Sequence, residues 1–308
     1  MRKPHRLEKG SRIAVVAPAS PFDRKSFDDG IAELEQVGLV PTWDESVFER
    51  RGFLAGSAEV RATAIRQALA DPSIAAIIAV RGGYGSAQVL PLLDPSEICA
   101  AQKPIIGYSD ITALLTFVTL DSGLVSFHGP MLEARLARGS QGYDRGSFER
   151  ALFHTEPMGE FDAPGVEAIT TGDFSGPIVG GTVTQLLASL GTPYAFDPPQ
   201  GHVLFFDEVG ERPYRLDRMV TQLRQSGLLA RAGAIVVGEL PRCDEPGGGP
   251  TSRATMADLF SEFPGPVLIG FPSGHTNSPQ QTIPFGVRAR VVADRHAPRL
   301  VIEEPAVQ

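Results

Sequence analysis

The run SIAAIIAV, residues 73–80, constrains the fold of this chain more than any other feature. It is apolar along nearly its whole length, which is typical of a strand that is buried on both faces. Helical patterns flank it on the N-terminal side. One ends at Gly38, a residue suited to a left-handed C-cap, and a second begins after Ser57 and stops at Pro72. This alternation predicts a parallel sheet with helices on both faces.

The rest of the N-terminal half continues the alternation. We expect a first strand at 12–17, a helix at 87–93, a strand at 104–107 and a helix at 111–120. The basic start and the short apolar run near the N-terminus imitate a signal peptide, but Glu8 interrupts the pattern. A first strand explains the run better, and we therefore expect a cytoplasmic protein.

The C-terminal half shows a different pattern of predicted helices and strands. Residues 151–175 lose periodicity and are rich in Gly, Pro, Thr and Asp, so we expect a linker there. It separates an N-terminal α/β domain at 1–150 from a C-terminal domain at 176–308. The second domain contains two helical patterns and four apolar strand patterns, among them HVLFFDEV and PVLIGF. We expect it to be β-rich and to close into a small barrel.

Charge and composition exclude several classes of function. The chain has 28 Lys and Arg against 36 Asp and Glu, a net charge of −8, and no long basic block, which argues against nucleic acid as a partner. The apolar runs are far shorter than the roughly 20 residues of a membrane span, so no membrane association is expected. Cys99 and Cys243 lack the spacing of a zinc site or a disulfide scaffold. No metal and no cofactor are expected.

Two loops follow predicted parallel strands and therefore lie where such sheets bind ligands. The first, RGGYGS at 81–86, is rich in glycine, so its backbone N–H groups can approach a phosphate or an oxyanion closely. It lacks the spacing of GxGxxG and the lysine of a P-loop. The alternative, a tight turn between a strand and a helix, explains these residues equally well.

The second loop, YSD at 108–110, places Ser109 where a strand enters a helix. Serine at a helix start is a common N-cap, and this explanation needs no function. The alternative is a nucleophile, although Ile111 replaces the second glycine of the G-x-S-x-G elbow. A nucleophilic serine also requires a base and an orienting acid.

The C-terminal half contains candidates for both partners. The strand HVLFFDEV ends in Asp207 and Glu208, and because strand side chains alternate, at most one of them faces a given site. A solvated strand end is the alternative for either. His275 lies in a loop rich in Gly, Ser and Asn, where binding groups are common. His128, in SFHGPM, is the competing histidine.

Six separated motifs together resemble a known family along nearly the whole chain. The chain is similar to L,D-carboxypeptidases of the LdcA/MccF type, which are serine peptidases. The motifs, in the order in which they occur, are RGGYGS, IIGYSDIT, FHGPM, GGTVTQLLASLGTPY, FFDEVGERPYRLDRMVTQL and GFPSGHTNSPQQTIPFG. The resemblance implies an N-terminal flavodoxin-like or Rossmann-like parallel sheet domain, a smaller β-rich, barrel-like C-terminal domain, and a homodimer.

The resemblance also implies a role for individual residues. The nucleophile falls on Ser109, the acid on Glu208 and the general base on His275. The implied oxyanion hole uses backbone N–H groups of the following three residues: Gly82, Gly83 and Asp110. An exopeptidase must also hold the terminal carboxylate of its substrate, and Arg81 is a candidate for this, with a structural salt bridge as the alternative.

The implied activity is release of a terminal D-alanine from a murein tetrapeptide, by cleavage after an L-centre. Two alternatives remain open. The microcin-immunity branch of the same family cleaves peptide–nucleotide conjugates. A non-catalytic, flavodoxin-like protein would instead hold an anion at the RGGYG turn and use Ser109 only as a cap. The expected partner in the first two cases is a small peptide or a peptide–nucleotide.

Overall fold

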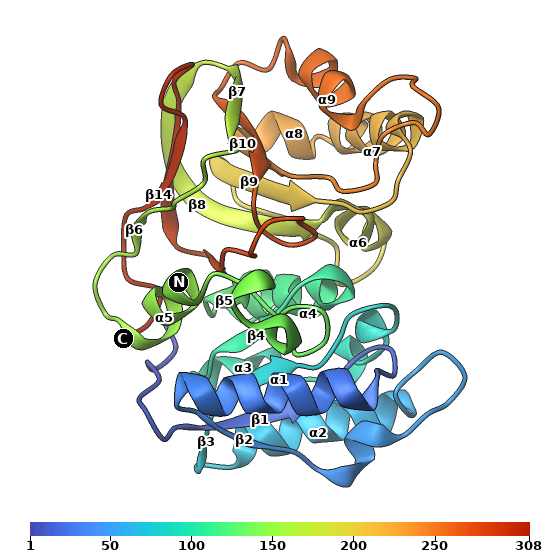
Figure 1. The fold of residues 1–308 in the computed structure, drawn as a ribbon, viewed down its shortest axis with the longest axis vertical. Coiled ribbons are helices and arrows are strands. Elements are labelled where there is room, and N and C mark those ends of the chain that lie inside the picture. Colours follow the sequence, from blue (N-terminus) through green and yellow to red (C-terminus); the bar gives the residue numbers. More distant parts are fainter.

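The computed structural model describes residues 1–308 and contains two sheets, one above the other in Figure 1. The first sheet is built from five parallel strands in the order β2-β1-β3-β4-β5. This is the strand order of flavodoxin-like doubly wound sheets, so the predicted fold class is confirmed. The strands are β1 (Arg12–Val16), β2 (Val40–Thr42), β3 (Ile74–Ala79), β4 (Ile105–Gly107) and β5 (Ser126–His128).

The helices of this half begin and end largely where the sequence predicts. Asp23 caps α1 through the N–H of Ser26, and the helix ends at Gly38, which is left-handed with φ of 94°. Ser57 caps α2 through the N–H of Val60. The α-helices around the first sheet are α1 (Arg24–Val37), α2 (Ala58–Ala70), α3 (Pro95–Ala101), α4 (Thr112–Thr116) and α5 (Arg145–Phe153).

Two predicted helices differ in form. The pattern at 87–93 contains Pro91, which lacks the N–H that a helix interior needs, and it forms two short 3₁₀ turns, η2 (Ser86–Gln88) and η3 (Leu90–Leu92). The predicted helix at 111–120 begins one turn earlier, as the 3₁₀ turn η4 (Ser109–Ile111), and ends in a π turn, η5 (Phe117–Asp121). None of the helices is both long and apolar enough to cross a membrane.

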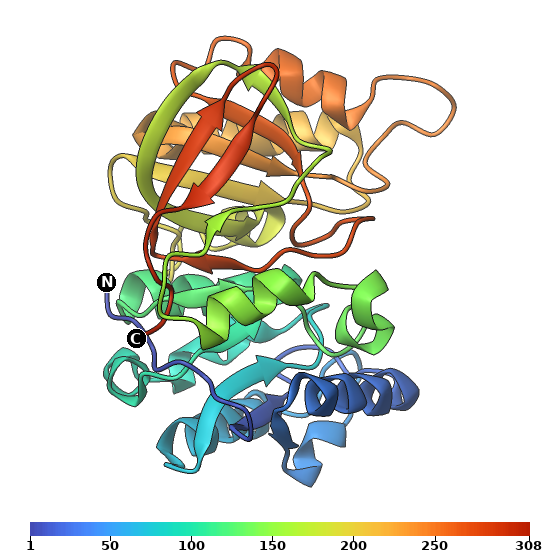
Figure 2. The same cartoon turned by 60° about the vertical axis from the view of Figure 1, so that its left-hand side comes forward.

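The second sheet has eight strands and curves strongly (Figure 2). Its centre is four parallel strands, β8 (Gly172–Thr182), β9 (His202–Asp207), β10 (Ala232–Gly238) and β11 (Val267–Phe271). Four helices connect them: α6 (Val183–Ala188), α7 (Pro213–Gln225), α8 (Leu228–Arg231) and α9 (Ser252–Phe260). This half is thus a β-rich sheet with more helical crossovers than the sequence pattern indicates. Two further strands, β13 (Arg288–Ala293) and β14 (Arg299–Ile302), pair antiparallel.

The stretch predicted as a linker, 151–175, takes part in the second sheet. It carries the end of α5, the short strands β6 (Gly159–Glu160) and β7 (Glu167–Thr170), and the first residues of β8. β6 and β7 form the two ends of the sheet. Edge strands this short pair through their backbones and need no apolar repeat, which is why composition alone indicates a linker.

The chain crosses back into the first sheet after completing most of the second. Strand β12 (Ile283–Phe285) pairs antiparallel with β5 and becomes the sixth strand of the first sheet. At the end of the chain, the N–H of Gln308 donates to Pro4 and its carbonyl accepts from Arg6, so both termini lie together at the junction (Figure 1). One apolar core runs through this junction, since Phe205 and Phe271 of the second sheet belong to the same buried cluster as the first.

Candidate active site

Ser109 lies on the sharp turn between β4 and α4 and has a strained backbone. Its φ is 62°, in the left-handed region that residues with a side chain rarely adopt. Its hydroxyl makes no hydrogen bond, and neither η4 nor α4 has a side-chain cap. The N-cap explanation is therefore contradicted. The side chain is half-buried, so its oxygen is free and accessible to a ligand.

Gly82 lies directly against Ser109. A Cβ atom on Gly82 would stand 2.9 Å from the Cβ of Ser109, 3.1 Å from its Oγ and 3.2 Å from the backbone N of Asp110. Any side chain here would displace the serine, so the position requires glycine. The N–H groups of Gly82 and Gly83 donate to no protein atom. The glycine that contacts the serine and the glycine that follows it thus each have a backbone donor without a protein acceptor, the kind of group from which an oxyanion hole is built.

Asp110 joins the glycine turn to the serine turn. Its Oδ2 accepts from the N–H of Ser86 at 2.8 Å, and the Ser86 hydroxyl donates to the carbonyl of Asp110. Both residues are buried. The two loops that the sequence indicates separately therefore form one rigid unit around Ser109.

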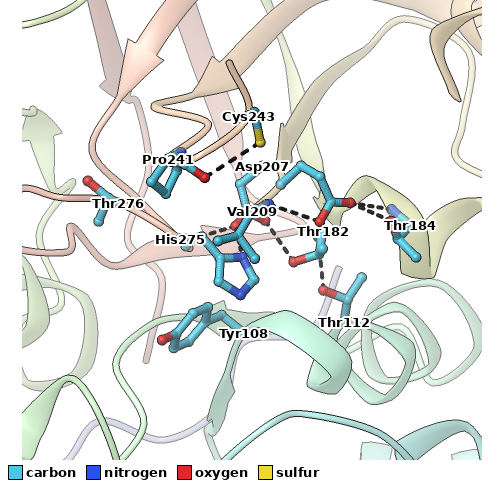
Figure 3. Close-up of polar contacts among 12 residues, drawn as sticks. Tyr108, Thr112, Thr182, Thr184, Asp207, Val209, Pro241, Cys243, His275 and Thr276 are labelled. Carbon is cyan, nitrogen blue, oxygen red and sulfur yellow. Dashed lines mark hydrogen bonds and ion pairs between the residues drawn. The ribbon is translucent and has the colours of Figure 1, made fainter. Parts of the chain in front are cut away.

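His275 is held by Asp207. Its Nδ1 and its backbone N each lie 2.6 Å from Asp207 Oδ2, and Figure 3 shows the ring between Asp207 and Tyr108. The Asp207 carboxylate is fully buried, and its Oδ1 accepts from the hydroxyl of Thr182 at 2.8 Å. Burial by itself would raise the pKa of Asp207, but the attraction and hydrogen bonds of His275 outweigh it and lower the pKa to about 2. Asp207 is thus an ionised acceptor that fixes the orientation of the imidazole.

The prediction that Glu208 orients His275 is corrected by these contacts. Glu208 points to the other side of β9, where its Oε2 accepts from the N–H of Thr184 at 3.1 Å and from the Thr184 hydroxyl. Its Oε1 accepts from the N–H of Val209 at 2.9 Å. Burial raises the pKa of Glu208, against the opposing effect of Thr184. Strand alternation correctly requires the two carboxylates to diverge, but the residue that faces His275 is Asp207.

Two threonines connect the acid to the serine turn. Besides its bond to Asp207, Thr182 donates its N–H to the hydroxyl of Thr112 at 3.0 Å (Figure 3). Thr112 begins α4, three residues after Ser109. Neither threonine was predicted from the sequence. A hydroxyl at the last position of a buried strand, as in the motif GGTVT, is the signal that could have identified Thr182.

His128, the competing histidine, is unsuited to act as a base. Both its ring nitrogens are buried without a hydrogen-bond partner. Burial lowers its pKa to about 4; the Asp207 carboxylate opposes this effect, and the charges of His275 and Arg135 reinforce it. The ring packs against aromatic side chains, with its centroid 5.1 Å from that of Phe205. His128 is therefore a neutral core residue near pH 7.

This burial predicts acid-sensitive stability. His128 and His202 are both buried, and burial lowers the pKa of each from 6.5 to about 4. As the pH falls, the unfolded chain protonates these histidines before the folded chain does. Their contribution to the unfolding free energy is therefore fully present above pH 6.5 and is lost as the pH drops towards 4. The difference in pKa between the unfolded and the folded chain corresponds to about 3 kcal/mol of unfolding free energy per histidine. We expect His128→Phe to flatten the dependence of the unfolding free energy on pH between 6.5 and 4, measured in urea. A slope as steep as that of the wild type would contradict this.

Arg81 is already paired. Its Nε lies 3.2 Å from Oε2 of Glu133, and its Nη1 donates to the carbonyl of Pro21 at 3.1 Å. The guanidinium is half-exposed, and the structural salt bridge considered from the sequence is present. The contacts of Arg81 therefore favour a role in holding the glycine turn.

Comparison with known proteins identifies the family of this chain. Family models described as the LD-carboxypeptidase N-terminal and C-terminal domains match residues 13–129 and 175–291. A probable murein peptide carboxypeptidase of Bacillus subtilis (strain 168) is 32% identical over 93% of this chain and 90% of its own length. The murein tetrapeptide carboxypeptidase of Pseudomonas aeruginosa is 29% identical over 92% of this chain and 94% of its own.

Solved structures share the whole fold. The muramoyltetrapeptide carboxypeptidase from Oxalobacter formigenes is 28% identical and superposes with a TM-score of 0.83 over 96% of this chain and 99% of its own. The microcin C7 self immunity protein MccF has a TM-score of 0.90 over 100% of both chains, at 21% identity, which is a likeness of fold. Since the two family models match most of the sequence, this chain belongs to the LD-carboxypeptidase family.

Proposed function

We propose that this protein is a serine peptidase with a Ser109, His275 and Asp207 triad, which releases a terminal D-alanine from murein tetrapeptides. The observation that carries the proposal is the pair of 2.6 Å contacts between His275 and Asp207, with the imidazole lying between Asp207 and Tyr108, the residue before Ser109 (Figure 3). A serine hydroxyl is a weak nucleophile at neutral pH and needs such a base. Asp207 takes the place given to Glu208 by the family resemblance.

The proposed reaction proceeds through an acyl-enzyme. Ser109 Oγ attacks the scissile carbonyl carbon while His275 Nε2 takes its proton, and Asp207 stabilises the imidazolium. The oxygen that becomes negative accepts from the N–H groups of Gly82, Gly83 and Asp110. The C–N bond then breaks, and His275 returns the proton to the departing amine of D-alanine. Water, which loses a proton to His275, then attacks the ester carbon; the bond to Ser109 Oγ breaks, and His275 returns the proton to that oxygen as the peptide acid leaves.

The substrate class is proposed from the relatives. Three relatives at 28–32% identity over nearly the whole chain, those of B. subtilis, P. aeruginosa and O. formigenes, carry names that specify murein or muramoyl peptides. The alternative, a peptide–nucleotide, is suggested by MccF structures such as the complex with aspartyl sulfamoyl adenosine, at 22% identity. That likeness extends to the fold alone, so we place the murein peptide first.

The substrate proposal predicts sensitivity to the chain end. We expect cleavage of a tetrapeptide that ends in an L-diamino acid and D-alanine, with kcat/KM at least about 10²-fold lower when that D-alanine is amidated, because groups that match the carboxylate lose their partner. An all-L tetrapeptide and an aspartyl sulfamoyl adenosine conjugate complete the panel, with released products identified by mass spectrometry. Equal cleavage of the amide or the all-L peptide would disprove a carboxypeptidase specific for D-alanine. Preference for the conjugate would favour the microcin-immunity activity.

A further inference from the structure

Arg135 is a buried cation without an acidic partner. It follows β5 and precedes the 3₁₀ turn η6 (Leu136–Gln141), and only 5% of its surface is exposed. Among residues 1–308 it forms no ion pair within 4.0 Å. A guanidinium stays charged at any physiological pH, and burying a charge is costly unless its donors are satisfied. Such a residue requires a structural explanation.

Three of the four hydrogen bonds of Arg135 go to the two loops of the candidate site, and the fourth goes from Nη1 to the carbonyl of Gly142 at 3.4 Å. Its Nη2 donates to the carbonyl of Gly274 at 2.8 Å and to that of Thr276 at 3.0 Å, the two residues that flank His275. Its Nε donates to the hydroxyl of Tyr108 at 3.3 Å, and its guanidinium carbon lies 5.6 Å from the centroid of that ring. Tyr108 immediately precedes Ser109. One side chain thus contacts the neighbours of both the proposed nucleophile and the proposed base.

The His275 loop is also held on its far side by Glu239, whose Oε2 accepts from the N–H of Asn277 at 2.7 Å. The loop lies between β11 and β12 and contains no helix or strand. Gly274 has φ of 70°, and a Cβ atom there would collide with the Asp207 carboxylate, so the backbone passes very close to the acid. The bonds to Asp207 hold the imidazole from one side, and the bonds from Arg135 hold the carbonyls on either side of it. The Tyr108 ring completes the enclosure, with its centroid 5.2 Å from that of His275.

We infer that Arg135 is a positioning residue that sets the placement of His275 relative to Ser109. This inference rests on the proposed function. Arg135 touches neither substrate nor the reacting atoms; it acts through the backbone of the loop and through Tyr108. A displacement of about 1 Å between reacting groups lowers rates by roughly 10²-fold. Loss of Arg135 should therefore lower kcat much more than it changes KM.

Lys103 offers a matched control. It is also a buried cation without an ion pair, and its Nζ donates to two backbone carbonyls, those of Ala68 at 2.8 Å and Asp71 at 2.6 Å. It precedes β4, at the opposite end of that strand from Ser109. Removal of Lys103 should thus disturb stability without reaching the active site.

The experiment compares Arg135→Met, Arg135→Lys and Lys103→Met with the wild type, well below their melting temperatures. Steady-state hydrolysis of the tetrapeptide gives kcat and KM, and labelling of Ser109 by a fluorophosphonate measures serine reactivity without the peptide. We expect Arg135→Met to lower kcat and the labelling rate by about 10 to 100-fold, with KM within about threefold. Arg135→Lys should recover part of this loss, since one ammonium can still reach a carbonyl. Lys103→Met should keep both rates within about twofold.

The outcomes separate this inference from the proposed function. If the wild type is not labelled at Ser109 and Ser109→Ala stays active, the proposed function is wrong and this inference fails with it. If Ser109 is labelled equally fast in Arg135→Met and the wild type, the inference alone is overturned. Equal losses in Lys103→Met and Arg135→Met would overturn it too. If Arg135→Met does not fold, Arg135→Lys decides: a reduced kcat supports positioning, and wild-type kinetics overturn it.

Discussion

Replacement of Ser109 by alanine should lower kcat by about 10⁴-fold or more while the protein remains folded. The hydroxyl makes no hydrogen bond in the structure, so its removal breaks no structural contact. It removes only the proposed nucleophile, whose loss in serine peptidases has effects of this size. Release of D-alanine from the tetrapeptide measures activity, and circular dichroism with thermal unfolding measures the fold. His275→Ala should approach the same loss.

Ser109→Gly provides a sharper control for the same position. With φ at 62°, serine and alanine are both strained here, whereas glycine is not. We expect Ser109→Gly to be as inactive as Ser109→Ala and more stable, by about 1 kcal/mol. Near-normal turnover in either variant would show that Ser109 is not the nucleophile and that its strained backbone has another cause.

Asp207→Asn should lower kcat by about 10³ to 10⁴-fold, whereas Glu208→Gln should lower it less than about tenfold. An amide at position 207 carries no charge to stabilise the imidazolium and can turn its NH₂ towards His275, which favours the wrong tautomer. Glutamine at 208 can still accept from Thr184 through its remaining carbonyl oxygen. Kinetics at saturating tetrapeptide measure both variants, and thermal unfolding shows whether each loss exceeds its effect on stability.

The opposite order of the two losses would contradict the assignment of the orienting role to Asp207. A larger loss of kcat in Glu208→Gln than in Asp207→Asn would return the orienting role to Glu208, as the family resemblance implies. Comparable losses in both would mean that β9 shifts when either carboxylate is changed. We expect neither result, because His275 contacts Asp207 at 2.6 Å, whereas the Glu208 carboxylate accepts only from Thr184 and Val209.

The fold was largely predictable because it depends on local patterns. The apolar run at 73–80 becomes β3 at the centre of the first sheet, and Gly38 ends α1 as its preference for a left-handed backbone predicts. The edge strands β6 and β7 escaped prediction because backbone pairing leaves little trace in composition. The antiparallel return of β12 escaped for a related reason. Its position depends on contacts between segments that are far apart in the sequence.

The candidate site was predictable in its residue types and less so in their arrangement. Ser109 and His275 stand out because each occupies a loop after a strand. Strand alternation shows that Asp207 and Glu208 diverge, but the choice between them depends on where the His275 loop crosses β9. The role of Arg135 is equally hidden, because its partners are carbonyl groups that every sequence contains. Long-range geometry decides all of these points.

The path of the chain after β11 has a consequence for protein synthesis. Ser109 and the glycine turn leave the ribosome with the first five strands, whereas His275 and β12 follow only after β6 to β11. A nascent chain therefore holds the proposed nucleophile long before it holds the proposed base. If the proposed triad is right, peptide cleavage requires the segment that ends in β12 and pairs with β5, so the onset of activity is tied to completion of the first sheet.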